Sequence, residues 1–182
     1  EKKTVATLMD APPQAGSIIN EVKDPKLGTT TWTLSNGVTL VMKPSDFKND
    51  QILLGASRAG GMSMVADTDF LQARYATTIV GVMGMKDIAP IELGKFLAGK
   101  NVSVSTKFGE NFEGISGSSS KRDLETMLQV IYLAITAPRR DPALFQSFVG
   151  KQQDALRNQM ASPFAVFQDQ LIHTMYPAHP RL

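Results

Sequence analysis

The chain has 182 residues, 42% of them hydrophobic, which is enough to bury the core of one substantial domain. Its 19 basic and 17 acidic residues give a formal net charge of +2, so charge offers no reason to expect nucleic acid or an anionic membrane as a partner. The sequence has no cysteine, which excludes disulfides, thiol catalysis and cysteine-ligated zinc. No stretch approaches the roughly 18 uncharged apolar residues of a membrane span.

The first 28 residues predict a linker. The opening EKKTVATLMDAPPQAGS has two adjacent prolines, few large apolar residues and no apolar core of a signal peptide. We therefore expect residues 1–28 to be a loosely structured lead-in. A chain that opens in a linker suggests a fragment of a longer protein.

Three strands are expected next. Asn36-Gly37 is the strongest short hairpin signal, and it lies between the β-rich runs TTWTL and VTLVMK. The following run, QILLGASRAGG, alternates apolar side chains at Ile52, Leu54 and Ala56, which predicts a third strand.

Two helices follow the third strand. Asp67 or Thr68 is a candidate cap for a helix that runs to about Met83 and ends at Gly84, since its apolar positions keep helical spacing. A second, shorter helix is expected from Pro90, a good first-turn residue, to Gly99. Its buried face would consist of Leu93, Phe96 and Leu97.

The remaining sequence predicts one more hairpin and three helices. NVSVSTKF and NFEGISGSS are strand-like arms around a turn at residues 109–111. Residues 120–123 approximate a capping box for a helix that Pro138 ends. Asp141-Pro142 opens a long helix to about Met160, and Ser162-Pro163 opens a final helix that ends before Pro177. The expected buried faces are Leu124, Met127, Leu128, Ile131 and Ile135 in the first of these helices, and Leu144, Phe145, Phe148, Leu156 and Met160 in the second.

The resulting order, β-β-β-α-α-β-β-α-α-α, predicts an α+β domain. Hairpins joined by helix pairs favour a mainly antiparallel sheet covered by helices on one face. We expect residues 29–182 to form this domain as a single unit.

Candidate metal ligands are scarce. The two histidines, His173 and His179, are six positions apart with Pro177 between them, whereas a pair on one helical face needs a spacing of three or four. A histidine near a helix end and a histidine in a loop explain both residues. The sequence predicts no metal site of its own.

Other catalytic patterns are weak. The segment GISGSSS, residues 114–120, follows a strand and precedes a helix, but it lacks the G-x-S-x-G spacing of a nucleophile elbow, and the helix cap explains its serines. VGVMGMKD and LAGKNV lack a phosphate-loop pattern and are typical of helix ends.

Charged candidates are also explained by structure. Asp67 and Asp69 suit the first turn of a helix, and Glu110 and Glu113 flank a turn, so neither pair sets up an acid and a base. The pair Arg139-Arg140, beside two prolines, is expected in a solvated loop.

Four long collinear stretches resemble the pitrilysin/insulinase family of zinc peptidases. They are WTLSNGVTLVMKP, the strand ending RAGGMS, LAGKNVSVS, and GSSSKRDLETMLQVIYLAITAPRRD. The resemblance covers residue 29 to the end and is closest to the C-terminal half of the large bacterial periplasmic members. It implies one domain of the fold shared with mitochondrial processing peptidase, a fold that the family's chains carry in tandem copies. It also implies that this domain is truncated at its C-terminus.

The family's zinc motif is absent from the position where the resemblance places it. Active members carry H-x-x-E-H on a helix, where two histidines on one face bind zinc and the glutamate activates water. The alignment places Asp69, Gln72 and Ala73 at these three positions. A ligating glutamate from a later helix would fall near Lys151-Gln152-Gln153-Asp154. We therefore expect no catalytic, cofactor-binding or metal-binding residue in this chain.

The resemblance implies a non-catalytic domain that helps to enclose and position a peptide substrate. Its partners would be the catalytic half of the parent peptidase and the peptide, zinc would reside in that catalytic half, and the location would be periplasmic. Two alternatives stay open. One is a stand-alone module that binds peptides without cleaving them. The other is a hydrolase that uses residues 114–120 or the pair His173 and His179.

Overall fold

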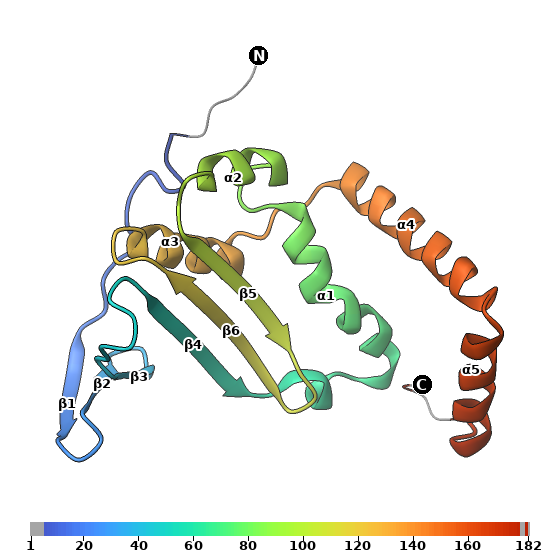
Figure 1. Ribbon diagram of the computed structural model, residues 1–182, viewed down its shortest axis with the longest axis horizontal. Helices are drawn as coiled ribbons and strands as arrows, with labels where there is room; N and C mark the ends of the chain where they lie inside the picture. Colours follow the sequence, from blue (N-terminus) through green and yellow to red (C-terminus); the bar gives the residue numbers. More distant parts are fainter. Residues whose placement is uncertain (1–5, 179–180, 182) are drawn as a thin grey trace. The chain divides into compact units, whose positions relative to one another are not determined.

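The computed structural model describes residues 6–178 and 181, which divide into two compact units (Figure 1). Met9–Gln51 forms the smaller unit, and Ile52–Leu182 together with Glu1–Leu8 forms the larger one. Of the helices in the described part of the chain, none combines the length and the apolar character that crossing a membrane requires.

The smaller unit is a three-stranded antiparallel sheet in the order β1-β2-β3, with β1 at Ile18–Asp24, β2 at Thr29–Leu34 and β3 at Thr39–Met42. The predicted hairpin turn is confirmed between β2 and β3, where Gly37 has a φ of 84° and the Asn36 side chain accepts a hydrogen bond from the Val38 N–H at 3.1 Å.

Strand β1 corrects the expectation that residues 1–28 lack regular structure. Its sequence, IINEVKD, does not alternate apolar and polar residues, so no local pattern marks it as a strand. Pairing with β2 holds it, and the Trp32 indole N–H donates to the Glu21 carboxylate at 2.7 Å across the two strands. The division into a linker and a domain at residue 29 stays a prediction.

The larger unit is built on a second antiparallel sheet in the order β4-β6-β5. Strand β4 spans Ile52–Ala59, β5 spans Val102–Phe108 and β6 spans Phe112–Ser119. Strand β4 pairs with β6, which follows about sixty residues later, and not with the hairpin that precedes it, so the described strands form two sheets. Sequence periodicity reports the face of a strand and not its neighbour.

Helices α1 and α3 pack against this sheet, and α2 lies between them in the chain (Figure 1). Helix α1 spans Phe70–Met83, α2 spans Pro90–Leu97 and α3 spans Leu124–Thr136, each close to its predicted bounds. Helix α1 contacts β5, and α3 contacts both β5 and β6. The predicted α+β class, an antiparallel sheet with helices on one face, is therefore confirmed for this unit.

The buried face of α3 differs from the predicted one. Met127, Val130 and Leu133 are buried, whereas Leu128 and Ile135 are 45% and 64% exposed. The helix carries apolar residues around most of its circumference, so spacing alone left two faces possible.

Two further helices lead away from the sheet, α4 at Pro142–Met160 and α5 at Pro163–Met175 (Figure 1). Asp141 caps α4 as predicted, since its carboxylate accepts the Leu144 N–H at 3.0 Å, but Ser162 makes no such bond for α5. Helix α4 packs on α1, with Tyr75 and Phe148 edge to face at 6.3 Å, and α5 packs on α4. Much of their apolar surface is exposed, which corrects the expected buried stripe of α4.

Candidate functional site

The segment between β4 and α1 is fixed against the turn that joins β5 and β6. Its two 3₁₀ turns are η1 at Gly61–Met64 and η2 at Asp67–Asp69. The Met62 N–H donates to Gly109 O at 2.9 Å, and the Ser63 N–H donates to Glu110 O at 2.8 Å. Gly61 has a φ of 74°, and a Cβ at this position would collide with the Gly109 carbonyl oxygen, so only glycine fits here.

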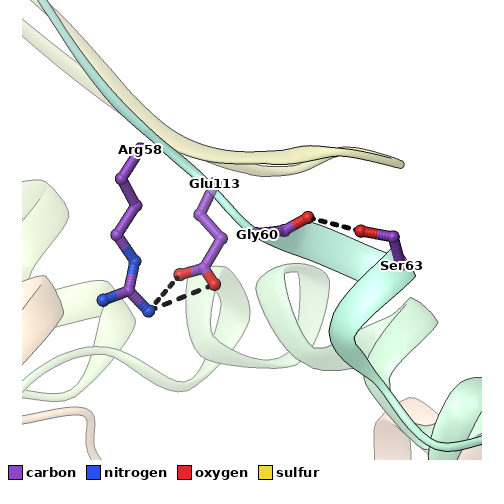
Figure 2. A network of polar contacts seen from close by, with 4 residues as sticks. All are labelled: Arg58, Gly60, Ser63 and Glu113. Atoms are coloured by element: carbon purple, nitrogen blue, oxygen red, sulfur yellow. Dashed lines mark hydrogen bonds and ion pairs between the residues drawn. The ribbon is translucent and has the colours of Figure 1, made fainter.

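An ion pair lies beside this segment, as Figure 2 shows. Arg58 of β4 and Glu113 of β6 are direct cross-strand partners, and Arg58 Nη2 lies 3.2 Å from both carboxylate oxygens of Glu113. The Ser63 hydroxyl donates to Gly60 O at 2.9 Å. The Glu113 carboxylate is held in an ion pair with Arg58, whereas Glu110 accepts the Ser63 N–H through its backbone oxygen. The two glutamates therefore have separate structural roles and do not form an acid–base pair.

The residues at the aligned zinc-motif position do not fit zinc. Asp69 is the exposed residue that precedes α1, Gln72 lies in the first turn with a neutral amide, and Ala73 has no ligand atom. Among the described residues, no three histidine, aspartate or glutamate side chains come together as a metal site would require. No catalytic step through zinc can be assigned to this part of the chain.

The structure also separates the other sequence candidates. His173 lies on α5 with its side chain 57% exposed and Nε2 3.6 Å from Asp169 Oδ1, and His179 lies outside the described residues. Ser116 lies in β6, the central strand of the sheet, and Ser120 donates its hydroxyl hydrogen to Asp123 at 2.7 Å. The described residues therefore place no histidine beside these serines.

Arg139 is not a solvated loop residue, which corrects the sequence expectation for the pair Arg139-Arg140. Its Nη1 lies 2.7 Å from Asp141 Oδ2 and donates to Met83 O at 3.3 Å, and only 23% of its side chain is exposed. Arg139 therefore joins the end of α1 to the cap of α4. Arg140 is exposed, as expected.

The larger unit contains a groove of about 520 Å³ between β5 and the helices α1, α2 and α3. The helices contribute Thr77, Thr78, Gly81, Leu93, Leu97 and Val130, among others. Five consecutive residues of β5, 102–106, also line it. Because successive side chains of a strand point to opposite faces, five in a row can line one groove only along the strand's edge.

The backbone of β5 has hydrogen-bonding groups that face this groove. Bonds from Ser120 N to Asn101 O and from Gly109 N to Phe112 O lie at the two ends of the β5–β6 ladder. Because bonded and non-bonded residues alternate along an antiparallel pair, the odd-numbered residues of β5 bond to β6. Val102, Val104 and Thr106 therefore turn their N–H and C=O groups away from β6, at the edge that borders the groove.

This groove is suited to holding an extended chain and not to acid–base chemistry. None of the residues described as lining it is charged, and its polar groups are backbone amides and the hydroxyls of serine and threonine. An extended peptide can add to a free strand edge through main-chain hydrogen bonds, with its side chains in the neighbouring pockets. Sequence reasoning missed the groove because β5 is recognisable as a strand, while its position at the edge of the sheet depends on long-range pairing.

The sequence is similar to two curated proteins and matches no family model. It is 25% identical over 179 residues to a zinc protease PQQL-like protein of Arabidopsis thaliana, covering 97% of this chain and 16% of that protein. It is 25% identical over 145 residues to a probable zinc protease PqqL of Haemophilus influenzae, covering 79% of this chain and 16% of that protein. The chain therefore spans about a sixth of the length of these relatives.

Two solved structures share the fold. A mutant of the ferredoxin protease FusC, in complex with Arabidopsis ferredoxin, has a TM-score of 0.81 and 18% identity over 95% of this chain and 19% of FusC. The periplasmic protease PqqL of Escherichia coli has a TM-score of 0.77 and 20% identity over the whole of this chain and 20% of PqqL.

The fold is therefore that of the insulinase-like peptidases. Together with the sequence relatives, this fold indicates the pitrilysin/insulinase-like peptidase family, and the chain is similar to one domain of a larger peptidase. This confirms the family resemblance drawn from the sequence.

Proposed function

We propose that this chain is a non-catalytic domain of a zinc metallopeptidase, which helps to enclose an extended peptide and to position it for an active domain elsewhere in the parent protein. The observation that carries the proposal is the β5 edge, where Val102, Val104 and Thr106 present unpaired backbone groups to an uncharged groove. Strand addition at such an edge holds a peptide by its main chain and so tolerates varied sequences.

The donor set at the start of α1 supports the non-catalytic part of the proposal. Asp69, Gln72 and Ala73 offer neither two ligands on one helical face nor a base to activate water. Zinc would belong to the active domain of the parent, as the names of the relatives suggest. Domains that surround a bound peptide contribute by excluding water and by fixing the orientation of the scissile bond.

A periplasmic location is part of the same proposal. The Escherichia coli protein with this fold is a periplasmic protease, and the lack of cysteine is compatible with that compartment. The catalytic half of the parent would be the main partner of this domain.

The experiment uses two glycines that lie in helices and have open space around an added Cβ. Gly81 of α1 lines the groove, whereas Gly94 of α2 does not. Gly81→Leu is expected to obstruct the groove and to weaken binding of unstructured ten-residue peptides at least about tenfold, by loss of strand-edge hydrogen bonds of about 0.5–1.5 kcal/mol each. Gly94→Leu is the matched control and should bind as the parent does. Equal binding by both variants would contradict the assignment of the groove.

A stand-alone peptide-binding module is the second candidate, and it uses the same groove. It differs from the first in needing no catalytic partner, so a chain that binds peptides with full affinity alone, and gains nothing from the catalytic half, favours it. A hydrolase that uses residues 114–120 is the weakest candidate, since these residues lie in the central strand and its buried end.

A further inference from the structure

Strand β5 alternates between half-buried and exposed residues. Its even-numbered residues, 102, 104, 106 and 108, are half-buried, and its odd-numbered residues, 103, 105 and 107, are exposed. The even-numbered side chains face the helices, because a Cβ added to Gly117, the β6 partner of Val104, would lie 2.7 Å from the Met127 sulfur atom of α3. Successive side chains of a strand point to opposite faces, so the odd-numbered side chains of β5 face the open side of the sheet.

A peptide that adds to the edge of β5 follows the same alternation. The N–H and C=O groups of Val102, Val104 and Thr106 point to the groove, so an antiparallel peptide forms its hydrogen-bonded pairs with these residues. The two residues of a pair place their side chains on the same face of the sheet. The peptide side chains opposite Val102, Val104 and Thr106 therefore enter the helix side of the groove, and the side chains between them point to the open side.

The helix side of the groove is apolar. Helix α1 runs beside β5 (Figure 1), and the helices contribute the aliphatic side chains of Val80, Leu93, Leu97, Val130 and Ala134. An ionised side chain that entered this side would lose water without gaining a charged partner, which is unfavourable. An aliphatic side chain would gain free energy from burial.

The open side of the sheet sets no such restriction. Ser105 and Lys107 of β5 are exposed there, and their partners in β6 are Ser116 and Gly114. These residues are small or polar. A peptide side chain directed to this face therefore stays in contact with water and can carry a charge.

We propose that the groove selects extended peptides by alternation: every second side chain is uncharged and aliphatic, and the side chains between them are unrestricted. The inference rests on the proposed function, since it uses the same strand edge, and it adds the class of peptide that this edge takes. Alternation of apolar and polar residues is typical of strands with one buried face. The groove therefore fits the strand-forming segments of unfolded protein chains.

Two fluorescent twelve-residue peptides of equal composition test the proposal on the whole 182-residue chain. The first alternates glutamate and valine, so it can place valine opposite Val102, Val104 and Thr106 together. The second repeats two valines followed by two glutamates, so in every register at least one glutamate enters the helix side. Fluorescence anisotropy should give the alternating peptide an affinity at least about tenfold higher, because a carboxylate is costly to desolvate without a partner.

A lysine placed in the groove should reduce this preference. Thr78 and Ala76 are both exposed residues of α1, and of the two, Thr78 lines the groove. Thr78→Lys should improve binding of the second peptide at least about fivefold, since a glutamate on the helix side then meets an ammonium group. Ala76→Lys is the matched control, because it adds the same charge outside the groove, and it should change neither affinity by more than about twofold.

Each remaining outcome has a defined meaning. Equal affinity of the two peptides for the unsubstituted chain, while the amides of Val102, Val104 and Thr106 still slow in hydrogen exchange, would overturn the alternation and leave strand addition intact. Equal gains for Thr78→Lys and Ala76→Lys would show attraction by net charge alone, and would also overturn the alternation. Binding of neither peptide would overturn the proposed function together with this inference.

Discussion

Ser120 and Asp123 are joined by two hydrogen bonds at the buried start of α3: the Ser120 hydroxyl donates to Asp123 Oδ2 at 2.7 Å, and the Asp123 N–H donates back to Ser120 Oγ at 3.2 Å. The same carboxylate accepts the Asn101 N–H at 2.9 Å, and the Ser120 N–H donates to Asn101 O. This cluster fixes the end of β6 to the residue that precedes β5. The capping box predicted for residues 120–123 is not formed: Asp123 itself is the residue before α3, and its carboxylate bonds the Ser120 hydroxyl and the distant Asn101 N–H instead of capping the helix.

Ser120→Ala is expected to lower the free energy of unfolding by on the order of 1 kcal/mol, because it removes the hydrogen bond that the hydroxyl donates to the buried Asp123 carboxylate. Its neighbour Ser119 is the matched control, because it is 1% exposed and its hydroxyl has no partner among the described residues. Ser119→Ala should leave stability unchanged or raise it, since a buried unpaired hydroxyl is unfavourable. Urea titration of both variants measures the difference, and equal destabilisation would count against the hydrogen-bond assignment.

Acid should destabilise the larger unit through Asp123 and Asp141. The Asn101 N–H, and then the Ser120 hydroxyl, lower the pKa of Asp123, and the Leu144 N–H, and then Arg139, lower the pKa of Asp141. Both folded-state pKa values lie below the usual value of about 3.9, so the stability that they contribute is complete above that pH and is lost as pH falls through the folded values.

Thermal melts between neutral pH and about pH 2 measure this effect. At neutral pH, Asp123→Asn should have a lower melting temperature than the unsubstituted chain. This difference should shrink in acid, as the Asp123 carboxylate of the unsubstituted chain takes up its proton. A gap between the two melting temperatures that is the same at every pH would contradict the linkage.

Gly61→Ala should lower the free energy of unfolding by about 2–3 kcal/mol, because the site combines a positive φ with backbone atoms where the Cβ would be. Gly150→Ala provides the contrast, since it lies in α4 with open space around it and should stabilise the chain by about 0.5–1 kcal/mol through helix propensity. Urea midpoints of the two variants should therefore move in opposite directions. Similar midpoints would show that the segment before α1 tolerates a side chain.

The chain should bind no stoichiometric zinc. Elemental analysis after dialysis against buffered zinc checks this, with the triple variant Asp69→His, Gln72→Glu and Ala73→His as a positive control, because it restores two histidines one turn apart. One equivalent of zinc in the unsubstituted 182-residue chain would show that ligands from distant segments converge.

The sequence predicted features that depend on local chemistry. Helix α1 ends at Met83 because Gly84 follows it, and α4 begins after Asp141-Pro142, where a capping carboxylate precedes a proline. Features that depend on distant pairing were missed: strand β1, the pairing of β4 with β6, and the contact of Arg181 with Asp67. The candidate site is limited in the same way: the sequence shows that the zinc motif is absent, but it does not show which strand lies at the edge of the sheet and borders a groove.

Backbone amide exchange along β5 in the presence of unstructured ten-residue peptides shows whether a peptide adds to this strand edge. We expect the amides of Val102, Val104 and Thr106 to exchange fast in the free chain and to slow down when peptide binds, while those of Ser103, Ser105 and Lys107 are protected throughout by β6. The peptide should remain uncleaved when zinc is supplied. Unchanged exchange at the three even-numbered residues under conditions where peptide is bound would rule out strand addition at β5, and cleavage of the peptide by this chain would rule out a non-catalytic domain.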